Sequence, residues 1–323
     1  MHQPLLPQGD AAALLPGATY SVPGLFLYPD LVYQCLDQIK AKFDYEIPVK
    51  YIYGSPRVRW NCGRPVMVDH GYTRADMEAQ LQGALDRGIV PLLTFSIPVM
   101  EEKDLEDPLG NDLLAMADKL GAGVIVSHPL LEAHIRTHYP NVELHASVIM
   151  TAFQKDRDPA FYEALARDHS RYVVHPDDNF DLALLNKLPK DRAEILLNER
   201  CVYQCPQRGE HYLTNTQDQA AILDGTGAFT NFLDRCPWVP DFKQRTTKGR
   251  NISLTAKEAA ELVELGFDLF KLQGRLDIPY VFFFDFLRYT LENEVAFPAF
   301  YPAFCFSIRA YEREKAKRRR AKP

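Results

Sequence analysis

Short apolar runs alternate along the chain with longer segments in which apolar residues recur every three or four positions. The short runs are typical of buried strands, and the longer segments are typical of helices that cover a sheet. Strands are predicted at residues 20–26, 50–53, 89–95, 123–126, 142–146, 171–174, 194–198 and 268–272. Helices are predicted at residues 30–43, 73–87, 112–120, 129–138, 159–169, 181–187, 255–265 and 278–292.

This alternation predicts an α/β fold in which eight parallel strands close into a (β/α)8, TIM-barrel-like domain. An open, doubly wound sheet is the alternative. Such a sheet normally carries a glycine-rich phosphate loop, and neither G-x-G-x-x-G nor G-x-x-x-x-G-K-[ST] occurs in the sequence. We expect a loose arm at residues 1–18, a single barrel domain at 19–308 with a long excursion after the seventh strand, and a basic tail at 309–323.

Composition narrows the class of protein. The 323 residues are 46% hydrophobic and 25% charged, which is ordinary for a soluble globular chain. No run of about 18 apolar residues indicates a membrane helix, and the N-terminal residues lack the basic start of a signal peptide. Six cysteines in a chain of this length do not predict a disulfide scaffold, so we expect a reducing, cytoplasmic location.

Charge is distributed unevenly. The net charge is −6, yet residues 309–323 hold eight Lys or Arg against two Glu. Such a tail could touch RNA or an acidic partner, and the competing interpretation is a solvated, frayed end. We favour the solvated end, because one short basic tail on an acidic body is a weak signal for nucleic-acid binding.

Reactive side chains concentrate in residues 195–212, ILLNERCVYQCPQRGEHY. Cys201 and Cys205 follow a predicted strand, and Glu199, Arg208 and His211 lie close to them in the sequence. Thiolates are soft ligands that suit iron–sulfur clusters or zinc. The segment therefore predicts a cluster or metal site where a core strand ends, against the alternative of two reduced cysteines in a surface loop.

In a closed barrel, the residues that follow each strand face one mouth. The polar candidates gathered there by this argument include Tyr53, Ser55, His145, His175, Glu199, Lys271 and Arg275. A four-cysteine site needs two thiolates besides Cys201 and Cys205, and the best candidates are Cys62 and Cys236. Their spacing does not match zinc-ribbon patterns, although zinc remains an alternative to a cluster.

Three motifs in this order resemble the U32 peptidase-like family. The first is N-E-x-C-x3-C-P-x-R-x2-H-[FY], which runs from Asn198 to Tyr212. The second is Y-G-S followed by G-R, which begins at Tyr53 and ends at Arg64. The third is F-K-[LIV]-x-G-R, which runs from Phe270 to Arg275. The resemblance implies a TIM-barrel-like fold. It also implies relatives that hydroxylate without oxygen, in ubiquinone synthesis or on tRNA and ribosomal RNA, some with a four-cysteine [4Fe–4S] cluster. Cys62, Cys201 and Cys205 match the family's cysteines, whereas the distant Cys236 departs from its spacing.

The leading hypothesis is an oxidoreductase of this type, a cytoplasmic iron–sulfur barrel that modifies a small anionic substrate by oxygen-independent hydroxylation or a related redox step. Cations could bind the substrate's carboxylate, and Glu199, His145, His175 or Lys271 could move protons. The substrate-binding candidates are Arg208, His211, Lys271, Arg275, Tyr53 and Ser55. One alternative is a non-catalytic subunit whose cluster or zinc holds a protein partner, such as a homologous subunit. Another is a U32-type peptidase.

Overall fold

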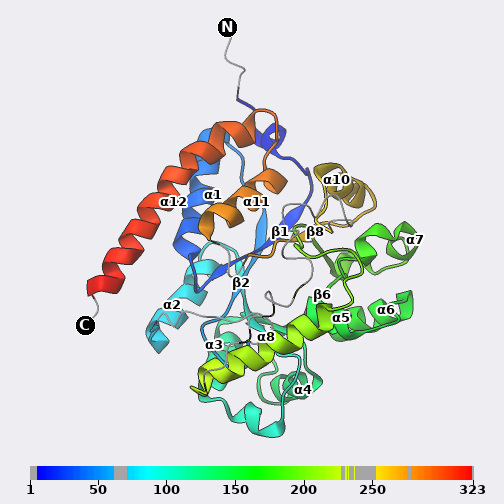
Figure 1. Ribbon diagram of the computed structural model, residues 1–323. Helices are drawn as coiled ribbons and strands as arrows, with labels where there is room; N and C mark the ends of the chain where they lie inside the picture. The colour runs from blue at the N-terminus through cyan, green and yellow to red at the C-terminus, as the bar shows by residue number, and fades with distance from the viewer. Residues whose placement is uncertain are drawn as a thin grey trace.

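The computed structural model describes residues 6–61, 71–226, 230, 232, 236, 252–274 and 278–321. Eight parallel strands form a closed barrel in chain order, with β1 paired to β8 (Figure 1). The strands are β1 (Thr19–Leu25), β2 (Val49–Gly54), β3 (Val90–Phe95), β4 (Gly123–Val126), β5 (Glu143–Ala146), β6 (Arg171–Val173), β7 (Ala193–Leu196) and β8 (Leu269–Lys271). The predicted (β/α)8 barrel is confirmed.

Helices surround the barrel (Figure 1). They are α1 (Pro29–Phe43), α2 (Arg74–Leu85), α3 (Pro108–Leu120), α4 (Pro129–His138), α5 (Val148–Phe153), α6 (Pro159–Asp168), α7 (Leu182–Leu185), α8 (Arg208–Leu223), α10 (Ala256–Glu264), α11 (Pro279–Thr290) and α12 (Ala296–Ala321). None of the helices in the described ranges is both long and apolar enough to cross a membrane.

Local sequence signals explain most helix starts. Thr73 and Asp76 form a capping box at α2, and Thr255 and Glu258 form another at α10, as the sequence indicates. The helix predicted from residue 112 begins at Pro108 instead, because the Asp107 side chain accepts a hydrogen bond from the Gly110 N–H. Proline is tolerated in the first turn of a helix, because the backbone N–H that it lacks has no hydrogen-bond partner within the helix there.

Three helices were not predicted: α5, α8 and α12. Helix α12 contains Pro302, which normally disfavours a helix interior. Tertiary packing compensates, because two buried rings of α12 contact neighbouring helices. The Phe300 ring lies 6.1 Å from the Phe43 ring of α1, and the Phe304 ring lies 4.9 Å from the Phe283 ring of α11. The stacking of α12 on both helices is visible in Figure 1.

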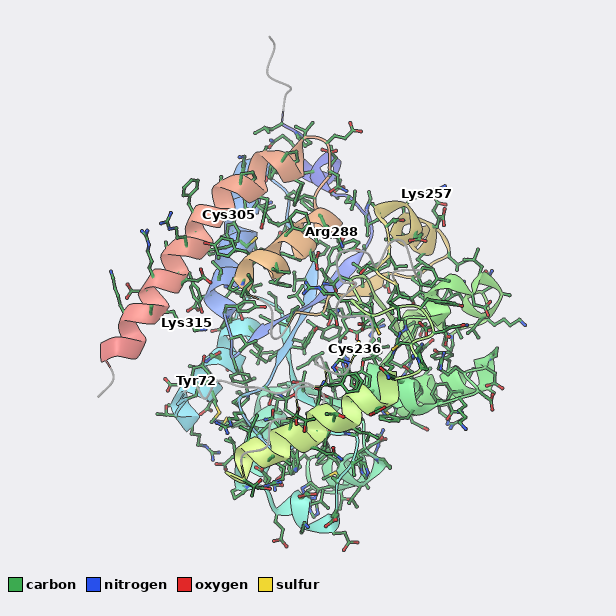
Figure 2. The ribbon with its side chains drawn as sticks, in the orientation of Figure 1. Tyr72, Cys236, Lys257, Arg288, Cys305 and Lys315 are labelled. Carbon is green, nitrogen blue, oxygen red and sulfur yellow. The ribbon has the colours of Figure 1, made fainter. Side chains whose placement is uncertain are left out.

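Both chain ends are more ordered than the sequence suggests. In the predicted loose arm, residues 9–12 form a 3-10 turn, and Ala12 and Leu15 are buried. The predicted frayed tail continues α12 to Ala321, and the side chains of Tyr311 and Lys315 both donate hydrogen bonds to the Leu27 carbonyl, at 3.2 and 3.0 Å (Figure 2). Backbone hydrogen bonding and apolar burial fix these segments.

The barrel interior is a small apolar cluster with charged neighbours. Tyr51, Tyr53, Leu92, Ile125 and Leu269 pack together inside it, apart from the larger core between strands and helices. Charged side chains also point inward, which is unusual because a barrel interior is normally filled by branched apolar residues. This polar column is described with the site below.

Gly54 ends β2 and lies opposite Leu25 of β1. A Cβ atom at this position would overlap the Leu25 carbonyl oxygen. We expect Gly54→Ala to lower the free energy of unfolding by about 1–3 kcal/mol, measured by urea denaturation, because the backbone must shift. Gly83→Ala in α2 is the matched control: nothing lies within 4 Å of its added Cβ, so stability should be unchanged or slightly increased. Equal stability of the two variants would contradict this expectation.

Candidate functional site

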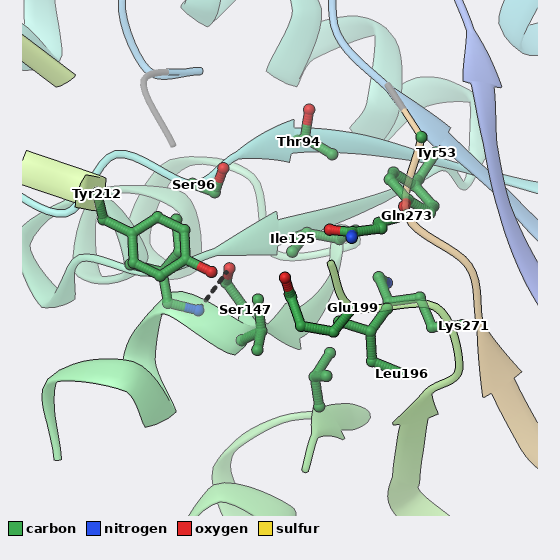
Figure 3. Close-up of a pocket in the computed structure, with 14 residues that line it drawn as sticks. Tyr53, Thr94, Ser96, Ile125, Ser147, Leu196, Glu199, Tyr212, Lys271 and Gln273 are labelled. Atoms are coloured by element: carbon green, nitrogen blue, oxygen red, sulfur yellow. Dashed lines mark hydrogen bonds between the residues drawn. The ribbon is translucent and has the colours of Figure 1, made fainter. Parts of the chain in front are cut away.

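A cavity of about 70 Å³ opens at the carboxyl ends of the strands, where barrel active sites lie. Its volume suits a few waters or a small organic molecule. Figure 3 shows side chains from several strands converging on it. The lining includes Tyr53, Thr94, Ser96, Ile125, Ser147, Leu196, Glu199, Tyr212, Lys271 and Gln273. Three of the predicted site residues, Tyr53, Glu199 and Lys271, therefore meet here.

A buried hydrogen-bond network holds the ends of β7 and β8 together. The Asn198 side chain accepts a hydrogen bond from the Gln273 N–H at 2.7 Å, and its amide donates to the Gln273 carbonyl at 3.1 Å and to Asp285 Oδ2 at 3.0 Å. The Gln273 side chain donates to the Asn198 carbonyl at 2.8 Å, and Arg200 donates to Asp285 at 2.9 Å. A fully satisfied buried network of this kind fixes a backbone rigidly. It therefore sets the position of Glu199.

Glu199 lies just past β7 and is only 6% exposed. Its backbone carbonyl accepts a hydrogen bond from the Ser253 hydroxyl at 2.8 Å. Its side chain lines the cavity and points into it in Figure 3. The sequence prediction that Glu199 faces the barrel mouth is therefore matched by the structure.

Cys201 and Cys205 lie together ahead of α8 and are both half-buried. A hydrogen bond between the two thiols lowers the pKa of Cys205 and raises that of Cys201, so Cys205 ionises first. The Gln207 N–H and the Arg208 guanidinium lower the pKa of Cys205 further, whereas burial opposes them. A partly exposed thiolate beside a cation is the form that binds soft metals.

Arg208 is buried beside the thiol pair. Its guanidinium donates to Asp177 at 3.2 Å and to the Val202 carbonyl at 3.1 Å, and it lies 3.4 Å from His175 Nε2. Burial, followed by Arg208 and Arg157, lowers the pKa of His175 to about 2. His175 is therefore neutral and a weak base, which disfavours the proton-moving role expected for it.

Lys271 points into the barrel, on the same face of β8 as Leu269, and is buried. Its ammonium lies 2.8 Å from Glu194 Oε2 and 4.5 Å from the centre of the Tyr53 ring. Burial raises the pKa of Glu194, but Lys271 and His145 outweigh it, so that pKa lies below its ordinary value. The partner of Lys271 is thus Glu194 on β7.

His145 was expected just past the fifth strand, and it lies within β5 instead. It is 1% exposed, its Nε2 lies 3.1 Å from Glu143 Oε1, and its ring contacts that of Tyr51 edge-on. It does not line the cavity. A direct proton transfer to a substrate there is therefore disfavoured for His145.

Other predicted site residues lie elsewhere or outside the described residues. The Ser55 hydroxyl donates to the Pro56 carbonyl at 3.0 Å, and the His211 ring stacks on Phe232 at 4.5 Å. Cys62 and Arg275 lie outside the described residues. Cys236 is half-buried (Figure 2). Within the described ranges, no three His, Cys, Asp or Glu side chains meet in a metal-holding group, so Cys236 does not join Cys201 and Cys205 there.

Sequence reasoning missed Glu194, Asp177 and Asp285. Glu194 had a readable signal, because it is the one charged residue in the apolar run AEILL of a predicted core strand. A charge on a fully buried strand requires a partner. Asp177 and Asp285 gave no such signal, since isolated acidic residues in loops and helices are usually solvated.

Neither a protein-family model nor a curated protein matches the sequence. Among solved structures, that of a U32 peptidase superposes with a TM-score of 0.49 and 16% identity, covering 80% of this chain and 92% of that chain. An HpcH/HpaI aldolase from Desulfitobacterium hafniense DCB-2 superposes with a TM-score of 0.30 and 14% identity, covering 80% of this chain and 87% of that chain. The first of these structures is described as a U32 peptidase, and the three sequence motifs resemble the U32 peptidase-like family.

Proposed function

We propose that this chain is an enzyme that carries a [4Fe–4S] cluster and modifies a small organic substrate in the mouth cavity. The reaction would be a hydroxylation that does not use O₂, or a related redox step. The observation that carries the proposal is the paired thiols of Cys201 and Cys205, held beside the cavity residue Glu199. Electrostatic effects link Glu199 to both Cys201 and Arg208.

The donor set fits such a cluster in part. Cys201 and Cys205 are soft and partly exposed, and the pKa of Cys205 is lowered by the Cys201 thiol and by Arg208, so the pair would hold two of the irons. The remaining ligands would come from Cys62, from Cys236 after a rearrangement, or from an outside molecule. When bound, a cluster supplies one-electron transfer. Two thiols fit zinc equally well, so metal analysis has to distinguish the two.

The protein's own residues would bind and orient the substrate. The Asn198–Gln273 network fixes the wall that carries Glu199, so its carboxylate is held ready to accept a proton or a hydrogen bond. Tyr53 and Tyr212 provide aromatic walls. The small volume of the cavity limits the water that can accompany a substrate.

Protein purified without oxygen is expected to contain iron and sulfide in equal amounts, about four of each per chain. Cys201→Ser and Cys205→Ser should each lose most of the iron, because each removes a thiolate ligand. Cys35→Ser and Cys305→Ser are the controls, since Cys35 is buried against the barrel in α1 and Cys305 lies on α12. Stoichiometric zinc without iron, or full iron in both ligand variants, would refute the proposal.

The same assay identifies the remaining ligands. Cys62→Ser and Cys236→Ser should lower the iron content if those thiolates complete the set. Iron that is unchanged in one of them assigns that position to another residue or to an outside molecule. Iron and sulfide are measured chemically, so this test does not require the substrate to be known.

A further inference from the structure

The carboxylate of Glu199 is the starting point, because it faces the cavity and no described residue donates a hydrogen bond to it. Among the described contacts of Glu199, the hydrogen bond is made by its backbone carbonyl, which accepts from the Ser253 hydroxyl. The residue is 6% exposed and its side chain points into the cavity. The carboxylate therefore offers an acceptor to whatever occupies the cavity.

Two described cations lie near Glu199, and each already contacts another carboxylate, although the charge of Arg208 also acts on Glu199. Lys271 lines the cavity, but its ammonium is paired with Glu194 at 2.8 Å. Arg208 directs its guanidinium toward Asp177, the Val202 carbonyl and His175. Lys271 and Glu194 cancel each other, so Glu199 leaves the described cavity wall with a net negative charge.

The polar groups around Glu199 are engaged as well. The Tyr53 hydroxyl donates to the Leu272 carbonyl, and the Thr94 hydroxyl donates to Asn61 at 3.2 Å. The Gln273 amide donates to the Asn198 carbonyl. These contacts engage three of the polar side chains of the cavity within the protein, whereas the Glu199 carboxylate faces the cavity as an acceptor for a ligand.

We propose that the cavity selects a substrate whose reacting end donates hydrogen bonds, an ammonium above all or a hydroxyl, and that it rejects a carboxylate. Glu199 is the specificity-determining group. The apolar side chains of Ile125 and Leu196 and the ring of Tyr212 accommodate a short apolar stem. An ammonium also gains from aromatic neighbours. This substrate class differs from the anionic one expected from the sequence, and the inference rests on the proposed function only in treating the cavity as the substrate site.

Three three-carbon probes of similar size test the inference on anaerobically purified full-length protein: propylammonium, 1-propanol and propionate. Dissociation constants are measured by calorimetry, with ligand-detected NMR for the weakest. We expect propylammonium to bind at least ten-fold more tightly than propionate, with 1-propanol between them. Glu199→Gln keeps the size of the side chain and should weaken propylammonium about ten-fold. Glu101→Gln, at an exposed position that does not line the cavity, removes the same charge and should change nothing.

Propionate binding as tightly as propylammonium would overturn the inference, as would an unchanged propylammonium affinity in Glu199→Gln. The comparison of the three probes on the unmodified protein stands even if that variant folds poorly. Iron and sulfide are measured on the same preparations. Ammonium selectivity without iron therefore upholds this inference and refutes the cluster, whereas a preference for propionate with full iron does the reverse.

Discussion

Replacing Lys271 with methionine is expected to lower the free energy of unfolding by about 3–5 kcal/mol at neutral pH. The substitution leaves Glu194, which is 1% exposed, with no cation at its Oε2 atom. Breaking one side of a buried ion pair costs more than the pair contributes, because the remaining charge stays desolvated. Urea denaturation measures the change.

The pH dependence has a defined sign. In the unmodified protein the folded pKa of Glu194 is lowered, so the stability due to its ionisation is present above the unfolded value of about 4.3 and is lost as pH falls through the folded value. In Lys271→Met the lysine charge no longer opposes the effect of burial on Glu194, so the pKa of Glu194 in the folded state should rise above its value in the unfolded state. Its contribution is then present at low pH and is lost as pH rises. The stability deficit of the variant should therefore be smaller at pH 5 than at pH 8.

A double variant controls for lost packing. Lys271→Met combined with Glu194→Met removes both charges and keeps similar volumes, so it should recover most of the lost stability. A single variant as stable as the unmodified protein at pH 8 would contradict the expectation. A double variant no better than the single one would assign the loss to packing.

Asn198→Asp is expected to cost about 2–4 kcal/mol of stability and to abolish the selectivity between the three probes. The Asn198 amide donates to both the Gln273 carbonyl and Asp285 Oδ2. A carboxylate of the same shape would face two acceptors and bring a like charge against Asp285. The adjoining Glu199 would lose its fixed position. Denaturation and probe binding are the two measurements.

The control for this change is Asn186→Asp, because Asn186 is exposed and its amide donates only to the Leu182 carbonyl among the described contacts. It should alter stability by less than about 0.5 kcal/mol. If Asn198→Asp behaves like Asn186→Asp, the network does not hold the ends of β7 and β8 together. Recovery of the Asn198→Asp variant at low pH would identify charge repulsion as the cause.

The barrel was predictable because its signals are local. Each strand is a short apolar run. The capping boxes that begin at Thr73 and Thr255 mark the starts of α2 and α10. Helix α12 was not predictable from the same rules, because Pro302 argues against a helix. Only the rings of Phe43 and Phe283, supplied by other helices, make that conformation favourable.

The candidate site divides in a similar way. Strand order placed Glu199 and Lys271 at one mouth, since the carboxyl ends of barrel strands meet there. The spacing of Cys201 and Cys205 was sufficient to predict that they act together. Which carboxylate neutralises Lys271 could not be read from spacing, because Glu194 and Glu199 lie in the same segment and only the inward face of β7 selects Glu194.

The sequence by itself determined the fold class and predicted a site at the barrel mouth that includes the thiol pair, because strand periodicity and motif spacing are properties of neighbouring residues. Tertiary structure alone decided the charge balance of the cavity. It pairs Lys271 with Glu194, holds His175 neutral beside Arg208 and leaves Glu199 facing the cavity. The physical reason is that desolvation and ion pairing act through distances between segments remote in sequence, and these distances exist only once the barrel has closed.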